Sequence, residues 1–136
     1  MSDAYDPYLD LFVKAVLGRK ALDVILLDVE ELTSLADTFI ICSGRSNRQV
    51  SAIAEFIRSD LKKSGLVPLS VEGLKEGHWV LMDYGSIVIH VFYDPVRRFY
   101  DLEGLWADAR RMTTPALESW NRQQSREELA GQSDDE

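Results

Sequence analysis

Residues 79–106 read WVLMDYGSIVIHVFYDPVRRFYDLEGLW, and the prediction of the fold starts from this stretch. Two apolar runs, at 78–83 and 87–92, flank Tyr84-Gly85-Ser86 and predict a β-hairpin. The stretch is rich in aromatic side chains and acids. It holds no cluster of carboxylates, histidines or cysteines that could carry out a reaction. It therefore favours a surface that docks on a partner over an active site.

The residues after the hairpin predict two short helices. Asp94-Pro95 ends the second strand, and residues 96–100 form one helical turn. Asp101 can cap a following helix that reaches Trp106. Arg97-Arg98 is either a solvated pair or a partner for Asp94 and Asp101, because two arginines are too few for a nucleic-acid patch.

The first part of the chain predicts a helix and two strands. Apolar residues recur at helical spacing over 7–17, between Asp6-Pro7 and Gly18. The runs at 23–29 and 38–43 are short and almost continuously apolar. Both are therefore expected to be central strands that are covered on two faces.

A second helix begins at a capping box, in which Ser46 caps the helix and Gln49 reaches back. Gly65 supplies its left-handed stop, and a weaker edge strand at 68–71 follows. A last helix is expected at 115–129. The acidic tail GQSDDE after it has the composition of a disordered segment.

These elements together predict an α/β fold: a five-stranded mixed sheet flanked by helices. The expected organisation is a single domain over residues 1–112. A C-terminal helix and the acidic, disordered tail then occupy residues 113–136.

The composition limits the class of function. The 136 residues carry a net charge of −8, which disfavours direct nucleic-acid binding over a broad face and favours a basic partner. The single cysteine, Cys42, excludes an internal disulfide and a cysteine-only zinc site. It fits a reducing cytoplasm, and the chain shows no signal peptide and no apolar run long enough for a membrane span.

The turn Gly44-Arg45-Ser46-Asn47 lies between a strand and a helix, where free backbone N–H groups can hold a phosphate. A nucleotidyltransferase uses a similar turn, but it also needs two or three carboxylates for magnesium. Only Asp83 is available on the following strands, and the chain has no Asp-x-Asp. A structural cap is the favoured interpretation. The alternatives are a weak anion site and a nucleotidyltransferase-like nucleotide-binding protein or regulator that uses this turn. No enzyme activity, cofactor or metal site is predicted.

The histidines and the cysteine favour structural roles. His90 lies inside the run IVIHVF and is expected to be a hydrogen-bonded sheet histidine. His78 and His90 have no ligand spacing for a metal. Cys42 lies in a predicted buried strand and is expected to act as a small apolar residue.

Alternation along the first strand of the hairpin separates its side chains into two sets. Trp79, Leu81 and Asp83 share one face, and Val80, Met82 and Tyr84 share the other. Trp79 is either a core residue or an interface anchor, and the sequence leaves both open.

Four segments stand in the order and spacing of one known family. They are ALDVILLDVEELTSLADTFIICSGRSNRQVSAIA at 21–54, LVPLSVEG at 66–73, HWVLMDYGSIVIHVF at 78–92 and RRFYDLEGLWADA at 97–109. With them, the chain resembles the ribosomal silencing factor family (RsfS, also called Iojap or YbeB). The combination of these segments is specific, although each one alone is weak.

The resemblance implies a nucleotidyltransferase-like fold that lacks its catalytic carboxylates. It implies binding to the large ribosomal subunit through its basic protein fourteen. Bound there, the protein would sterically block association with the small subunit and repress translation under nutrient limitation. Some family members are homodimers when free. By position, the partner-facing residues would be Trp79, Asp83, Tyr84, Tyr100, Leu102 and Glu103.

Overall fold

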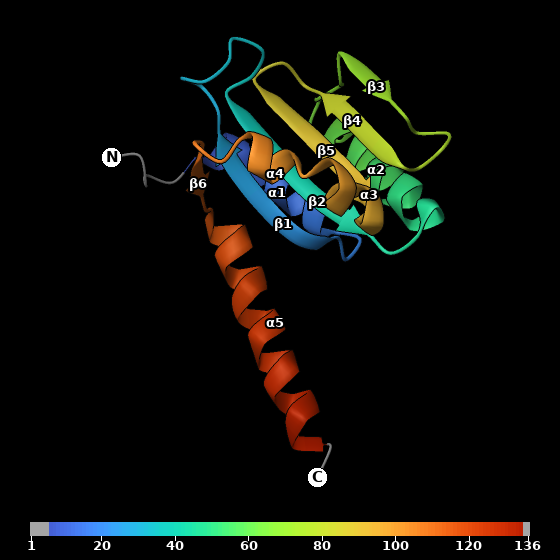
Figure 1. Cartoon of the computed structure of the whole chain (residues 1–136), viewed down its shortest axis with the longest axis vertical. Helices are drawn as coiled ribbons and strands as arrows, with labels where there is room; N and C mark the ends of the chain where they lie inside the picture. Colours follow the sequence, from blue (N-terminus) through green and yellow to red (C-terminus); the bar gives the residue numbers. More distant parts are fainter. Residues whose placement is uncertain (1–5, 135–136) are drawn as a thin grey trace.

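The computed structural model describes residues 6–134, and it describes side chains as far as residue 130. Within this range the chain forms one mixed sheet with the strand order β3-β4-β5-β2-β1-β6 (Figure 1). Only β2 and β5 pair in parallel, and the other neighbours are antiparallel. The strands are β1 (Leu22–Asp28), β2 (Thr38–Gly44), β3 (Ser70–Glu72), β4 (Trp79–Asp83), β5 (Ile87–Tyr93) and β6 (Arg110–Met112).

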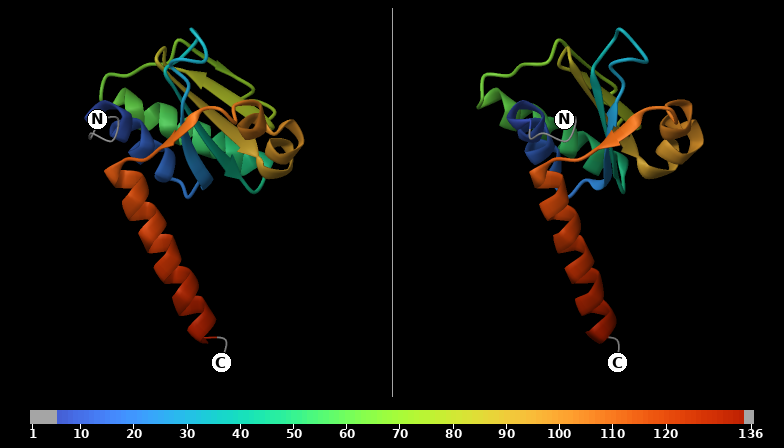
Figure 2. Two further views of the ribbon diagram at one scale, coloured as in Figure 1. Left: turned by 60° about the vertical axis from the view of Figure 1, so that its left-hand side comes forward. Right: turned by 90° about the vertical axis from the view of Figure 1, so that its left-hand side faces the viewer.

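Helices cover both faces of the sheet. The helices are α1 (Pro7–Leu17), α2 (Asn47–Lys62), α3 (Asp94–Tyr100), α4 (Leu102–Leu105) and α5 (Pro115–Asp134). Helices α1 and α2 enclose the larger apolar core on one face, whereas α3 and α4 lie on the other face over a smaller core (Figure 2). The predicted α/β fold with a mixed sheet and flanking helices is therefore confirmed.

The prediction of five strands is wrong, because β6 adds a sixth at the edge. This strand reads Arg-Arg-Met, which has too few residues and too little alternation to be recognised locally. It forms because Met112 pairs with Leu26 of β1, far away in the sequence. The short strand β3 covers Ser70–Glu72 rather than 68–71.

The two early strands differ in burial. Every residue of β2 is buried, as expected for a central strand. The same expectation is wrong for β1, whose first residues are half-buried or exposed. Strand β6 pairs only with Leu26, Leu27 and Asp28, so the beginning of β1 remains at the edge of the sheet.

The residues predicted to start and stop α2 are found at its two ends. Ser46 Oγ accepts from the backbone N–H of Gln49 at 3.0 Å. The Gln49 side chain accepts from the N–H of Arg45, one residue before the position that a capping box would use. Gly65 has φ +81, which confirms the predicted left-handed stop of α2.

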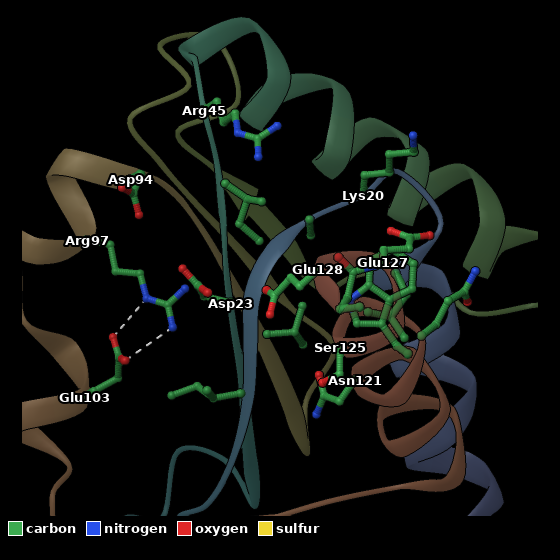
Figure 3. Close-up of a pocket in the computed structure, with 18 of the residues that line it drawn as sticks. Lys20, Asp23, Arg45, Asp94, Arg97, Glu103, Asn121, Ser125, Glu127 and Glu128 are labelled. Atoms are coloured by element: carbon green, nitrogen blue, oxygen red, sulfur yellow. Dashed lines mark hydrogen bonds and ion pairs between the residues drawn. The ribbon is translucent and has the colours of Figure 1, made fainter. Parts of the chain in front are cut away.

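Helix α5 projects away from the body of the molecule (Figure 1). A hollow of about 1320 Å³ lies between α5, the beginning of β1 and α3 (Figure 3). Its walls carry both signs of charge, with Lys20 and Arg45 among the cations and Asp23, Glu127 and Glu128 among the acids. This mixture does not select a ligand of one charge.

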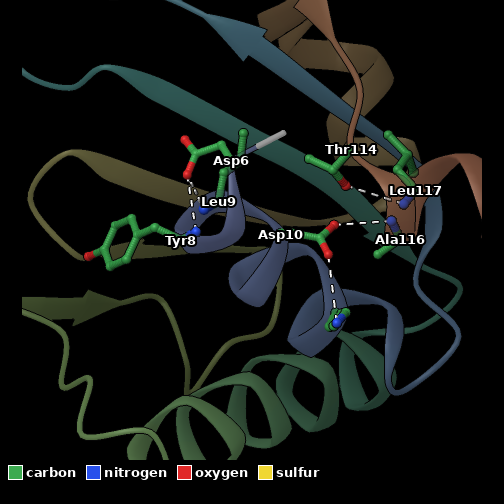
Figure 4. A network of polar contacts seen from close by, with 8 residues as sticks. Asp6, Tyr8, Leu9, Asp10, Thr114, Ala116 and Leu117 are labelled. Carbon is green, nitrogen blue, oxygen red and sulfur yellow. Dashed lines mark hydrogen bonds and ion pairs between the residues drawn. The ribbon is translucent and has the colours of Figure 1, made fainter. Parts of the chain in front are cut away.

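The first turn of α5 is fixed to α1 (Figure 4). The buried carboxylate of Asp10 accepts from the N–H of Ala116 at 3.0 Å, and Thr114 Oγ1 accepts from the N–H of Leu117 at 3.3 Å. Leu117 is buried in the larger core. The helix continues past the predicted end at 129 to Asp134. The predicted disorder of the tail concerns residues 131–136, whose side chains lie outside the described residues. The division at residue 112 stays a prediction.

Candidate functional site

Trp79 is held at the beginning of β4 by three neighbouring rings. Its indole stacks on Phe92 of β5, with ring centroids 4.7 Å apart and an interplanar angle of 28°. Its Nε1 donates a hydrogen bond to His90 Nδ1 at 3.1 Å, and its ring lies 5.2 Å from Tyr100 of α3. Trp79 is only half-buried, so it contributes to the smaller core and also reaches the surface.

Exposed apolar side chains on α3 and α4 extend this surface. Phe99 is 80% exposed, Tyr100 is 50% exposed and Leu105 is 76% exposed. The rings of Phe99 and Tyr100 lie 5.2 Å apart, so Trp79, Tyr100 and Phe99 form a continuous row, which we call the aromatic face. Exposed aromatic residues on a rigid support are typical of protein-binding surfaces.

Phe99 and Leu105 are not among the residues predicted from the sequence to face a partner. In the structure, Arg97 and Leu102 occupy the buried side of these short helices. Burial of that side directs Phe99 and Leu105 outward. The burial of an arginine, however, is not evident from a local pattern.

An ion-pair network fixes α3 and α4 to the end of β2. The guanidinium of Arg97, a residue only 7% exposed, donates from Nε and Nη2 to both oxygens of Glu103, at 2.9 and 3.2 Å. Its Nη1 donates to Ser43 Oγ at 2.8 Å. Arg97 is therefore neither solvated nor paired with Asp94 or Asp101, in contrast to the prediction, whereas Arg98 does pair with Asp94. Figure 3 shows the Arg97–Glu103 pair.

The structure brings some of the six residues suggested by the resemblance together and separates others. Trp79 and Tyr100 are in contact on the aromatic face. Leu102 and Glu103 lie close by on α4, but Leu102 is buried and Glu103 is bound to Arg97. Leu102 belongs to the smaller core against which Trp79 packs, and the side chain of Glu103 is 28% exposed.

Tyr84 and Asp83 lie apart from the aromatic face. Tyr84 packs against Phe12 of α1, on the opposite side of the sheet, with ring centroids 5.1 Å apart. Its hydroxyl is buried without a hydrogen-bond partner among the described residues, and burial raises the pKa of Tyr84 to about 12. Asp83 Oδ1 accepts from the N–H of Gly85 at 2.8 Å and so stabilises the hairpin turn.

His90 and Cys42 are the two residues whose pKa values burial shifts most, and both lie inside the sheet. His90 is the predicted hydrogen-bonded sheet histidine, which the contact with Trp79 confirms. Desolvation lowers the pKa of His90 to about 4, so the ring is neutral at pH 7. Cys42 is fully buried, and burial raises the pKa of its thiol to about 12. The thiol is therefore not a nucleophile.

The sheet register separates the residues that a transferase site would need. The partner of Gly44 on β5 is Tyr93, whereas the partner of Asp83 is Val88. Because a strand advances about 3.3 Å per residue, more than about 15 Å separates Asp83 from the Gly44–Asn47 turn. Among the side chains described for residues 6–130, no three carboxylate, histidine or cysteine groups are placed to hold a metal. Over the same residues, none of the helices has the length and apolar character needed to cross a membrane.

Comparison with known proteins identifies relatives along most of the chain. The family model described as "Ribosomal silencing factor during starvation" matches residues 2–136. The ribosomal silencing factor RsfS of Bacillus subtilis is 43% identical over 91 residues, which cover 67% of this chain and 77% of the relative. The mouse protein named "Mitochondrial assembly of ribosomal large subunit protein 1" is 30% identical over 101 residues, which cover 72% of this chain and 44% of the mouse protein.

The fold has a close match among solved structures. A crystal structure of a Chromobacterium violaceum protein superimposes with a TM-score of 0.70 at 39% identity, covering 79% of this chain and 86% of that chain. The names of these relatives describe silencing or assembly of ribosomes and no catalysed reaction. Sequence, fold and relatives agree, and the chain belongs to the ribosomal silencing factor family.

Proposed function

We propose that this protein docks on the large ribosomal subunit and sterically blocks its association with the small subunit. Translation is thereby repressed, above all when nutrients are limiting. The observation that carries the proposal is the aromatic face, in which Trp79, Tyr100 and Phe99 form a partly exposed row. Trp79 lies on β4, whereas Tyr100 and Phe99 lie on α3. Arg97 of α3 is hydrogen-bonded to Ser43 of β2 and ion-paired with Glu103 of α4, so α3 is fixed to the sheet.

Charge and kinship support the choice of partner. A net charge of −8 suits a basic ribosomal protein, and protein fourteen of the large subunit is the partner that we propose. The mouse relative is named for assembly of the ribosomal large subunit, which favours that subunit over the small one. A cytoplasmic location and a homodimer in the free state complete the proposal.

The α/β frame itself is proposed to be nucleotidyltransferase-like without the catalytic carboxylates. The strand–turn–helix at Gly44–Asn47 supports this kinship, since the turn ends at a helix N-terminus. The alternative function, a nucleotide-binding protein that uses this turn with Asp83, gains no support. In the register of the sheet, Asp83 lies too far from the Gly44–Asn47 turn for both to contact the same phosphate group of a nucleotide.

A sedimentation assay with separated ribosomal subunits tests the proposal. The wild-type protein should co-migrate with the large subunit only and should reduce the fraction of joined ribosomes. Trp79→Ala and Phe99→Ala should each weaken binding, Trp79→Ala by roughly 2 kcal/mol or more, which is typical of an aromatic hot spot.

Leu69→Ala is the matched control, because Leu69 is 75% exposed and lies beside Asp83, at the other end of β4 from Trp79. It should bind like the wild type. Circular dichroism and thermal unfolding establish that each variant is folded. Unchanged affinity of folded Trp79→Ala and Phe99→Ala would refute the assignment of the docking surface, and binding to the small subunit alone would refute the proposed partner.

A further inference from the structure

We propose that His90 is a positioning residue for docking, because its Nδ1 fixes the orientation in which Trp79 is presented to the partner. The idea rests on the proposed function, since it assumes that Trp79 contacts the ribosome. His90 itself is only 4% exposed and does not reach the surface. It therefore acts through Trp79.

The geometry restricts the indole to one orientation. Trp79 Nε1 lies 3.1 Å from His90 Nδ1, and Phe92 supports the indole plane at a centroid distance of 4.7 Å. If the indole turned over about its Cβ–Cγ bond, its N–H would leave the acceptor, and the buried Nδ1 would lose its hydrogen bond. A buried polar atom without a partner is unfavourable, so the observed orientation predominates.

The environment of His90 keeps Nδ1 available as an acceptor. Phe39 meets the imidazole edge-on at 4.9 Å, and Phe92 lies nearly parallel to it at 6.3 Å. Such apolar surroundings favour the neutral ring. Because Nδ1 accepts from Trp79, the hydrogen-bond network assigns the ring proton to Nε2.

Packing alone does not account for a histidine at this position. His90 Nε2 is buried and has no hydrogen-bond partner among the residues that the structure describes. A phenylalanine would fill similar space between Phe39 and Phe92 without burying an unpaired N–H group. What histidine adds is the acceptor at Nδ1, and the indole of Trp79 is the group that uses it.

Nuclear magnetic resonance of the full chain tests the contact directly. The indole N–H resonance of Trp79, assigned by its loss in Trp79→Phe, should move upfield in His90→Phe, and its exchange with water should accelerate. His90→Asn should retain much of the wild-type signal, because the asparagine Oδ1 occupies a place similar to that of Nδ1. A residue that acts only by filling space would not show this rescue.

Affinity for the large subunit tests the consequence for docking. His90→Phe should weaken binding roughly three- to tenfold, as expected when one net hydrogen bond no longer favours the binding orientation. His90→Asn should bind more tightly than His90→Phe. If His90→Phe does not fold, the comparison of His90→Leu with His90→Asn serves the same purpose.

Each outcome has one meaning. An unchanged indole resonance in His90→Phe overturns the contact. A shifted resonance with unchanged affinity, while Trp79→Ala binds weakly, overturns the positioning role and leaves the docking surface in place. If Trp79→Ala binds like the wild type, the proposed docking site fails and the positioning role fails with it. In that case the resonance still reports the hydrogen bond, so the two failures are distinguishable.

Discussion

Acid should destabilise this protein through His90, and the size of the effect follows from its burial. The imidazole is 4% exposed, and desolvation lowers its pKa from an ordinary value of 6.5 to about 4. Between these two pKa values the unfolded chain binds the proton and the folded chain does not. Stability that is present above pH 6.5 is therefore lost as the pH falls toward 4.

The magnitude follows from the pKa difference. Each pKa unit corresponds to about 1.4 kcal/mol, so a shift from 6.5 to about 4 predicts a loss of about 3 kcal/mol between neutral pH and pH 4. This is a large fraction of the stability of a small domain, which is typically about 5–15 kcal/mol.

Urea denaturation of the wild type and of His90→Phe, at several pH values from about 7.5 to about 4, measures the effect. All other ionisable groups are the same in both proteins, so their contribution cancels in the difference. The variant also lacks the hydrogen bond to Trp79. This loss lowers the stability of the variant by nearly the same amount at every pH at which His90 of the folded wild type is neutral, so it does not imitate the pH dependence. The wild type should lose about 3 kcal/mol more than the variant over this range. Parallel stability curves would refute the reasoning.

Three further predictions concern the fold. Gly73→Ala should lower the free energy of unfolding by about 3 kcal/mol, because Gly73 has φ +83 and an added Cβ would collide with the backbone of β4. Gly65→Ala should lower it by only about 1 kcal/mol, because Gly65 has a similar φ of +81 but lies in open space. Thermal unfolding compares the two variants. Arg97→Met should cost about 3 kcal/mol in urea denaturation because it leaves a partly buried carboxylate unpaired, while Arg98→Met, whose side chain is 77% exposed, should leave the midpoint unchanged. Equal midpoints for these two variants would contradict the structural role of the buried pair. The thiol of Cys42 should react with Ellman's reagent only after the protein is unfolded, and rapid reaction of the native protein would contradict its burial.

Local patterns in the chain predicted most elements of the fold correctly. The hairpin around Gly85, the Ser46 cap and the Gly65 stop all form, since each depends on residues within a few positions of one another. Strand β6 was missed, because its pairing with β1 joins residues that are far apart along the chain. The extent to which β1 is buried was wrong for the same reason.

The candidate site was predicted less completely than the fold. The aromatic content of residues 79–106 indicated a docking surface, and Trp79 and Tyr100 do lie together. The exposure of Phe99 was missed because it follows from the burial of Arg97 against Ser43, a contact between distant parts of the chain.

Alternation and turn chemistry in the sequence place Trp79 and Tyr84 on opposite faces of one hairpin, because neighbouring residues and backbone geometry alone set that pattern. Whether each face becomes core or surface depends on the helices that pack there. Helix α1 covers Tyr84, while α3 leaves part of Trp79 accessible and gives it Tyr100 as a neighbour. Burial is a property of the assembled layers, so the tertiary structure was needed to show which of the two rings reaches the surface.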